Sequence, residues 1–211
     1  MFEKSMKVKI TFTAPVLGGS PNSETIYSDF IASKAPDALT MEEEIAQFGA
    51  VAVEGEKTTV FMRTLIDGEE VPTMWSYHIK GFFKAAGTAL RRPKKMKTKT
   101  ESSKLAAHKR VIVEEINIMP RQIVLHAPDG IPTEEAITIH QRPLRINTAV
   151  ERVALASSEM LPPGTWAEFE INLMSEEYEA AVREWLDYGK YYGLGQRRND
   201  GFGTFEWEEI Q

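Results

Sequence analysis

The sequence contains no cysteine among its 211 residues. This absence excludes disulfide bonds, thiolate metal ligands and cysteine nucleophiles, and it suits a reducing compartment such as the cytoplasm. No apolar run approaches the roughly 20 residues that span a bilayer. The opening residues, MFEKSMKVKI, have neither the apolar core nor the small-residue cleavage site of a signal peptide. We therefore expect a cytoplasmic protein without membrane association.

The sequence also lacks the motifs of common metal and cofactor sites. It has no HExxH, no P-loop and no carboxylates at metal-ligand spacing, so we expect neither metal nor cofactor. Its four histidines belong to no assignable motif, and a lone histidine is more often packed or solvated than catalytic. His78 is the best candidate for acid–base catalysis because it lies beside Tyr77 at an expected helix start. His140, which precedes the basic sequence QRPLR, is the second candidate.

Charge is distributed very unevenly along the chain. The net charge is −6, yet the segment from Lys80 to Arg110 contains eleven Lys and Arg residues and a single acid, Glu101. This segment therefore carries +10 and the remainder of the chain −16. A lone basic run is usually a solvated loop, but segregated charge is also what steers a polyanion to one region of a protein.

Hydrophobic periodicity predicts a chain of mixed helices and strands. Val8, Ile10 and Phe12 alternate with polar residues, which predicts a strand over 7–17. Trp166 and Phe169 belong to a second alternating stretch, and we expect both to point inward with Ile171 and Leu173. The other expected elements are helices at 25–33, 36–48, 77–92, 103–110 and 175–193, a strand with a turn at Asp67-Gly68, two strands within 111–128 split at Pro120, a hairpin over 136–164 and a final strand at 202–210.

The stretch YYGLGQRRNDGFGTF, residues 191–205, places four glycines and two arginines between the last helix and the last strand. A helix cap and an Asp200-Gly201 turn explain two of these glycines. Gly195 and Gly203 need another reason, and glycines beside arginines let a backbone approach phosphate closely. The stretch is not a dinucleotide-binding fingerprint, because that motif follows a strand and opens a helix.

Four stretches follow one another in an informative order: KVKITFTAPVLGGS, YHIKGFFKAAGTALRR, RPLRINTAVERVALASSEMLPPGTWAEFEI and YYGLGQRRNDGFGTFEW. In this order they resemble the RAMP (repeat-associated mysterious protein) superfamily of CRISPR systems, and most of all its guide-RNA-binding backbone subunits. They are similar to the first strand with its loop, the first-helix motif, the thumb hairpin with its following strand, and the C-terminal glycine-rich loop. The first-helix motif keeps Lys80, Gly81 and Arg91 but lacks the usual Pro-Gly-Ser-Ser lead.

The resemblance implies one α+β domain over residues 1–211, with a ferredoxin-like (RRM-like) antiparallel sheet and helical and thumb-like hairpin insertions at about 23–50, 93–110 and 140–160. It implies single-stranded RNA, or single-stranded DNA, as partner, together with other RAMP-like subunits or further copies of the chain. It also implies a role in antiviral defence. The expected nucleic-acid-binding residues are Lys80, Lys84, Arg91, Arg92, Lys94, Lys95, Lys97, Arg142, Arg145, Arg152, Gly193, Gly195, Gln196, Arg197, Arg198, Asn199, Gly201 and Gly203.

Three functions remain open from the sequence. The favoured one is non-catalytic binding of single-stranded nucleic acid by a backbone-like subunit. The second is a metal-independent endoribonuclease that processes RNA through one of the histidines. The third is a RAMP mimic, encoded by a virus or mobile element, that inhibits an effector complex or sequesters a nucleotide signal. The third function remains open because strong acidity outside residues 80–110 is unusual for a protein that coats RNA.

Overall fold

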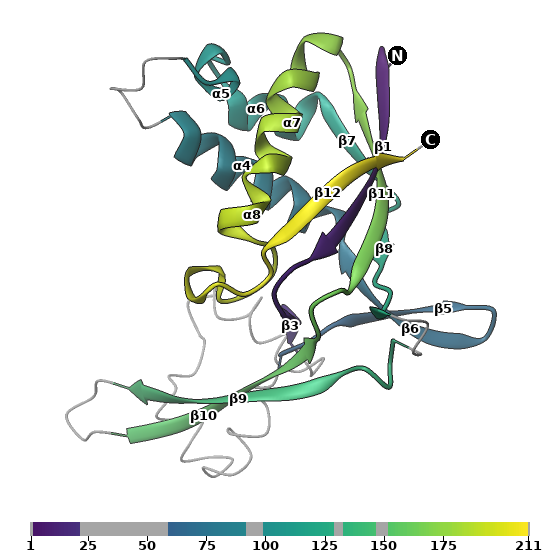
Figure 1. The fold of residues 1–211 in the computed structure, drawn as a ribbon, viewed down its shortest axis with the longest axis vertical. Coiled ribbons are helices and arrows are strands. Elements are labelled where there is room, and N and C mark those ends of the chain that lie inside the picture. Colours follow the sequence, from purple (N-terminus) through teal and green to yellow (C-terminus); the bar gives the residue numbers. More distant parts are fainter. Residues whose placement is uncertain (1, 22–58, 92–98, 129–132, 147–151, 211) are drawn as a thin grey trace, which may run out of the picture. The chain divides into compact units, whose positions relative to one another are not determined.

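The structure is a computed structural model, and it describes residues 2–21, 59–91, 99–128, 133–146 and 152–210 (Figure 1). The helices expected at 25–33 and 36–48 lie outside these residues. The contacts divide the chain into two compact units. The first comprises residues 1–16, 62–136 and 161–211, and the second comprises residues 17–61 and 137–160.

A four-stranded antiparallel sheet is the base of the first unit. Its strands are β1 (Lys4–Phe12), β7 (Ile116–Met119), β11 (Trp166–Leu173) and β12 (Phe205–Ile210), and their spatial order is β12-β1-β11-β7. Helices α4 (Ser76–Arg91) and α7 (Glu179–Asp187) follow β1 and β11 in the chain. A β-α-β-β-α-β unit with this order is the ferredoxin-like arrangement, so the predicted fold class is confirmed.

Alternation of side chains decides which face of the sheet is buried. Met6, Val8, Ile10 and Phe12 of β1 are buried, as predicted. On β11 the buried set is Ala167, Phe169, Ile171 and Leu173.

The expected inward position of Trp166 is wrong. An even-numbered residue of β11 points to the face opposite that of Phe169. There the His126 ring stacks on the Trp166 ring with their centroids 4.0 Å apart. The Lys9 ammonium lies 4.8 Å from the centroid of the same indole. The large apolar surface of Trp166 is therefore covered by neighbouring side chains outside the core.

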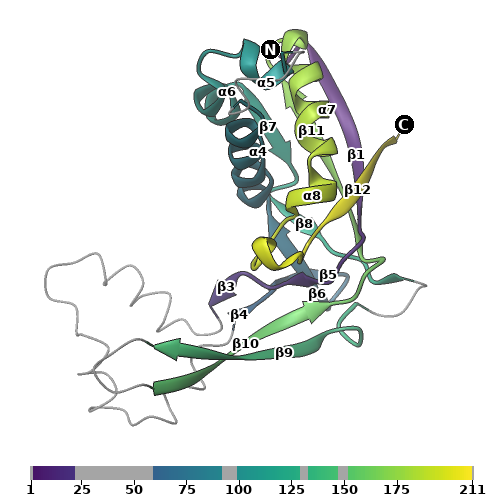
Figure 2. The same ribbon diagram turned by 60° about the vertical axis from the view of Figure 1, so that its left-hand side comes forward.

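Two helices cover the buried face of the sheet, as Figures 1 and 2 show. The predicted helix at 77–92 is confirmed as α4, which buries Ile79, Phe82, Phe83 and Ala86. The predicted last helix is observed as a short 3-10 turn, η2 (Glu176–Tyr178), then α7 and α8 (Gly189–Tyr192). Phe83 meets Trp185 of α7 with ring centroids 5.4 Å apart. Each such buried side chain stabilises the fold by roughly 1.5–3 kcal/mol.

The helix expected at 103–110 is wrong in its bounds. The chain forms two short helices, α5 (Glu101–Lys104) and α6 (His108–Glu114), separated by extended backbone at Leu105. Residues 111–114, expected as strand, complete α6, because Ile112 is buried while Val113 on its other side is exposed. Tertiary burial here overrides the β-propensity of a Val-Ile-Val run.

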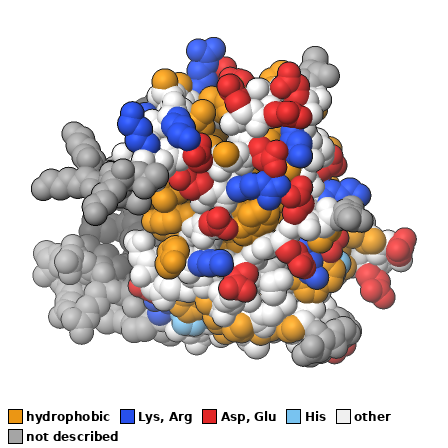
Figure 3. Space-filling model, turned by 45° about the horizontal axis from the view of Figure 1, so that its top comes forward, with side chains coloured by type: hydrophobic (Ala, Val, Ile, Leu, Met, Phe, Trp, Pro, Cys, Tyr) orange, Lys and Arg blue, Asp and Glu red, His pale blue; other side chains and the backbone are white. Residues whose placement is uncertain are grey.

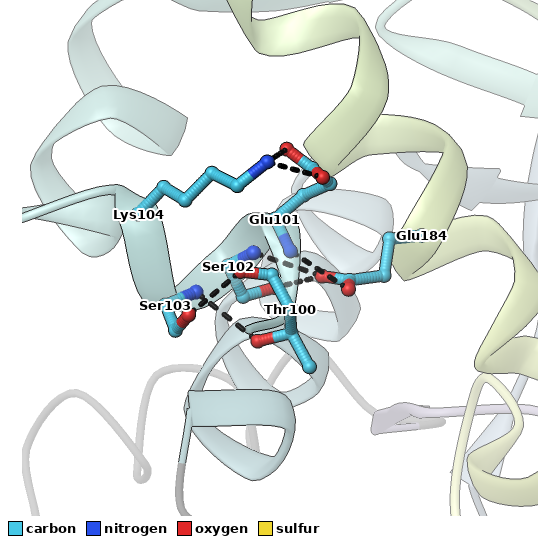
Figure 4. A network of polar contacts seen from close by, with 6 residues as sticks. All are labelled: Thr100, Glu101, Ser102, Ser103, Lys104 and Glu184. Carbon is cyan, nitrogen blue, oxygen red and sulfur yellow. Dashed lines mark hydrogen bonds and ion pairs between the residues drawn. The ribbon is translucent and has the colours of Figure 1, made fainter. Parts of the chain in front are cut away.

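A carboxylate from α7 holds α5 in place (Figure 4). Glu184 accepts hydrogen bonds from the backbone N–H groups of Glu101 and Ser102, both at 2.9 Å, and from the Ser102 hydroxyl at 2.6 Å. The Trp185 indole donates to that same hydroxyl at 2.7 Å. The first N–H groups of a helix have no partner inside the helix, and this carboxylate accepts two of them. It thereby anchors the start of α5 to α7.

A three-stranded antiparallel sheet leads into α4. Its strands are β5 (Met62–Ile66), β6 (Glu69–Trp75) and β8 (Gln122–Val124), in the order β5-β6-β8. The predicted turn at Asp67-Gly68 is confirmed, with φ of +52° and +87° at the two residues, as a type I′ hairpin turn requires. The predicted division at Pro120 is also confirmed, since β7 ends at Met119 and β8 begins at Gln122.

The second unit is built around the predicted hairpin, which is confirmed. Strands β9 (Thr138–Ile146) and β10 (Arg152–Leu161) pair antiparallel from Met160 opposite Thr138 to Arg152 opposite Ile146. Short strands complete the sheet, namely β2 (Val16–Leu17), β3 (Ser20–Pro21) and β4 (Thr59–Val60). The Glu159 carboxylate accepts the backbone N–H of Phe61 at 2.8 Å and so ties β10 to the chain after β4. In the part of the chain that the structure describes, no helix is long and apolar enough to cross a bilayer.

Candidate nucleic-acid interface

The glycine-rich loop between α8 and β12 is folded back on itself. The Leu194 N–H donates to the Gly203 carbonyl at 2.7 Å, and the Gly203 N–H donates to the Pro15 carbonyl at 2.8 Å. Gly193, Gly195, Gly201 and Gly203 all have positive φ, between +71° and +85°. These bonds join the two ends of the loop and tie it to the chain after β1.

Two of the glycines are required by the closure itself. A Cβ on Gly203 would overlap the Leu194 carbonyl oxygen, and one on Gly193 would lie 2.5 Å from the Phe202 carbonyl oxygen. A Cβ on Gly201 would meet nothing within 4 Å. The sequence pattern suggested that Gly203 makes room for a ligand. The structure gives a different reason for glycine here, because Gly203 lies against the backbone of Leu194.

We predict that Gly203→Ala destabilises the protein by roughly 3 kcal/mol or more, because backbone overlap adds to an unfavourable φ. Gly201→Ala is the matched control. It has the same positive φ without the overlap, and it should cost about 1–2 kcal/mol. Urea unfolding of both variants measures the difference, and equal losses of stability would contradict the role given to the Leu194–Gly203 contact.

The two arginines of the loop have different neighbours. Arg197 forms an ion pair with Asp200 at 2.7 Å, and its guanidinium lies 5.4 Å from the centroid of the Phe202 ring. Arg198 lies over the Tyr192 ring at 4.7 Å. Tyr192 in turn stacks on Tyr188 of the preceding turn, with ring centroids 5.8 Å apart. Arg197 therefore contacts residues of the loop itself, whereas Arg198 packs on Tyr192 at the end of α8.

The loop lies beside the start of α4. Both ribbon views show the loop at that end of the helix and α5 and α6 at the other (Figures 1 and 2). His78, in the first turn of α4, is partly buried, and this burial lowers the pKa of its imidazole. The positive charge of Arg198 lowers the pKa of His78 further. His78 is therefore harder to protonate than a free imidazole.

An aromatic cluster at the same end of α4 was missed by the sequence analysis. The Tyr77 ring stacks on Trp75 with centroids 6.2 Å apart, and it lies nearly perpendicular to the His78 ring, with centroids 4.5 Å apart. The Arg121 guanidinium lies 5.2 Å from the Trp75 ring centroid. The sequence WSYH hinted at an aromatic helix start, but nothing in it identified Arg121 as a neighbour.

Other predicted basic residues on α4 are engaged in packing. The Lys80 ammonium donates to the Val113 carbonyl at 3.3 Å, and burial, followed by the charge of Lys84, lowers its pKa. Arg91 donates to the Ala106 carbonyl at 3.3 Å and to His108. Arg91 is thirteen residues beyond His78 on α4, about 20 Å along the helix axis. These side chains connect α4 to α6 and to Ala106, which precedes α6.

The remaining predicted binding residues are divided between several places. Arg92, Lys94, Lys95 and Lys97 lie outside the described residues. Arg142 and Arg145 are on β9 and Arg152 is on β10, all in the second unit, where His140 also lies on β9. In the glycine-rich loop, Asn199 is exposed and Gln196 is half-buried.

Part of the basic segment is neutralised locally. Basic and acidic side chains are interspersed on the face that Figure 3 draws. Lys104 forms an ion pair with Glu101 at 2.6 Å, and Arg110 forms one with Glu114 at 2.8 Å. Within residues 2–21, 59–91, 99–128, 133–146 and 152–210, no three His, Asp or Glu side chains are grouped as a metal site would require.

His108 is held by hydrogen bonds at both ring nitrogens. Arg91 donates to its Nδ1 at 2.7 Å, so the proton is on Nε2, which donates to the Thr88 hydroxyl at 3.1 Å. Thr88 donates to the Lys84 carbonyl at 2.7 Å. This chain requires a neutral imidazole. Burial, followed by the charges of Arg91 and Lys109, lowers the pKa of His108 below 6.5.

We predict that the protein loses stability as the pH falls below about 6.5. A histidine whose pKa is lowered by folding binds its proton more readily in the unfolded chain, so acid favours unfolding. The contribution of His108 is fully present above pH 6.5 and lost progressively below it. His108→Gln should flatten the dependence between pH 8 and 5, measured by urea unfolding at each pH. An unchanged slope would show that His108 does not carry this sensitivity.

Comparison with known proteins gives a consistent picture of the fold. No protein-family model and no curated protein matches the sequence. Among solved structures, 99% of this chain superposes on a chain of the type III-B Cmr-beta bound to cognate target RNA, with a TM-score of 0.55 and 14% sequence identity. A chain of a type IV-B CRISPR complex matches over 98% of this chain, with a TM-score of 0.55 and 11% identity. The chain thus has a fold similar to that of these two subunits.

The two neighbours differ in length. The match covers 60% of the type III-B chain and 90% of the type IV-B chain. The chain described here therefore spans less than two thirds of the first neighbour. At these identities the likeness concerns the fold, and it leaves the site to be argued from the residues present.

Proposed function

We propose that the protein binds single-stranded RNA, without cleaving it, as a backbone-like subunit of a CRISPR effector complex. The observation that carries this proposal is the position of Arg198, which lies over the Tyr192 ring, while Tyr192 faces Phe82 of α4 with ring centroids 6.5 Å apart. The glycine-rich loop and the start of α4 thereby form one surface. Such a complex would work in the cytoplasm, with RAMP-like subunits or further copies of this chain as neighbours.

The chemistry of this surface suits a phosphate backbone. A guanidinium donates up to five hydrogen bonds and pairs well with phosphate oxygens. The start of a helix adds the positive end of its dipole, and the loop contributes short side chains and backbone N–H groups. Arg197 keeps the loop in shape through Asp200, so that Arg198 is presented from a fixed backbone.

The two structural neighbours support the same assignment. One belongs to a type III-B assembly bound to target RNA, and the other to a type IV-B CRISPR complex. The hairpin of β9 and β10 corresponds to the thumb that the sequence resemblance implies. We further propose that Arg142, Arg145 and Arg152 of the hairpin, and Arg92, Lys94, Lys95 and Lys97 of the basic segment, contribute positive charge to RNA binding.

We predict that Arg198→Ala weakens binding of a 12-nucleotide single-stranded RNA by about ten- to a hundredfold. Loss of a charge-assisted hydrogen bond costs about 1.5–3 kcal/mol. The slope of log K against log salt should also become shallower by about 0.7, the value for one phosphate contact on a single strand. Fluorescence anisotropy over a series of salt concentrations measures both effects.

Lys7→Ala is the charge-matched control for this experiment. Lys7 is exposed on β1, on the face of the sheet away from the helices, so its removal changes the net charge equally without touching the loop. Equal losses of affinity in both variants would show general charge attraction rather than a site. No binding to any single strand at low salt would contradict the proposed function.

A specific observation favours endoribonuclease activity as the second candidate. His78 is neutral beside Arg198, the arrangement in which an imidazole can accept the 2′-hydroxyl proton while a guanidinium stabilises charge on the phosphate. Attack of that oxygen on phosphorus would expel the 5′-oxygen of the next nucleotide and leave a 2′,3′-cyclic phosphate.

We expect the wild-type protein to leave bound RNA intact over hours without metal ions, as the binding proposal requires. Denaturing electrophoresis of end-labelled RNA checks this. Fragments that end in cyclic phosphate, and that disappear both in His78→Ala and on 2′-deoxy substrate, would establish the nuclease instead.

A further inference from the structure

The start of α4 carries an exposed aromatic stack. Tyr77 has 59% of its surface exposed, which is high for an aromatic side chain. Its ring stacks on Trp75 at a centroid distance of 6.2 Å with only 17° between the ring planes. The Arg121 guanidinium lies over the Trp75 ring, 5.2 Å from its centroid. The three side chains form a layered surface of cation, indole and phenol.

The backbone holds this stack rigidly. Trp75 is the last residue of β6 and pairs with Gln122 of β8, and α4 begins at the next residue without a linker. The Ser76 N–H donates to the Arg121 carbonyl at 2.8 Å. Strand pairing and this bond together fix the residues that bear the indole, the guanidinium and the phenol. The backbone that carries Tyr77 is therefore already ordered, so binding a ligand there costs little conformational entropy.

The stack continues toward the proposed RNA surface. The His78 and Tyr77 rings meet at an interplanar angle of 74° with their centroids 4.5 Å apart, and the charge of Arg198 in the glycine-rich loop lowers the pKa of His78. The nearby Arg121 adds positive charge, which favours the same polyanion.

We propose that Tyr77, supported by Trp75 and Arg121, is a base-stacking platform for the bound strand. This inference rests on the proposed RNA binding and adds the groups that recognise the bases. Every nucleobase has a π-face, so a phenol stack accepts bases of any sequence, as a subunit that coats RNA requires. The ligand class is a single strand with unpaired, splayed bases.

Two oligonucleotides separate stacking from charge. The first is a 12-nucleotide uridine RNA, and the second is an abasic strand with the same ribose phosphates. Tyr77→Ala should weaken binding of the uridine RNA by about five- to a hundredfold and leave the abasic strand unchanged. Tyr77→Phe, which keeps the ring, should bind both strands like the wild type. Phe2→Ala is the control, since Phe2 before β1 is also an exposed aromatic, at 45%, and its removal should change the affinity for neither strand.

The outcomes distinguish this inference from the function it rests on. If Arg198→Ala weakens both strands while Tyr77→Ala changes neither, RNA binding stands and the stacking platform is wrong. If Tyr77→Ala weakens both strands equally, Tyr77 serves the backbone path and the stacking platform is likewise wrong. If the wild-type protein binds neither strand at low salt, the proposed function itself fails.

Discussion

The close approach of two backbone segments, at Leu194 and Gly203, is the constraint on which the rest of the site depends. Only glycine fits at Gly203, because any Cβ would overlap the Leu194 carbonyl. Immediately afterwards, Phe205 packs against Phe82 at 5.2 Å and fills the space left by the missing side chain of Gly189. Loop closure therefore sets where β12 joins the sheet and, at the same time, where Arg198 meets the start of α4.

Helix α4 has two ends with different surroundings. Its start carries Tyr77 and His78, and the side chains of Tyr77 and of the neighbouring Arg121 are exposed there. Its last turn is bound through Arg91 to His108, and the Glu184 carboxylate secures α5 beyond it. We expect the first end to position the strand and the second to add charge attraction.

Much of the fold could be predicted from the sequence, because hydrophobic alternation and helical spacing report burial directly. Those signals identified β1, α4, the β9–β10 hairpin and the glycine-rich loop. They failed where long-range contacts decide, as at Trp166, whose ring is covered by His126 from a distant segment. The site was predicted only in part for the same reason. Arg121 and Trp75 are 46 positions apart and meet only because β6 pairs with β8, and nothing local distinguished Arg197 from Arg198.

The central claim is that single-stranded RNA lies across the glycine-rich loop and the start of α4. Photochemical crosslinking of a 4-thiouridine RNA, followed by mass spectrometry of the peptides, tests it most directly on the unmodified protein. The account predicts adducts on the peptides that contain Tyr77 and residues 191–203, and their loss when unlabelled RNA competes. Adducts confined to the opposite face of the sheet, around Lys9 and Trp166, would contradict it.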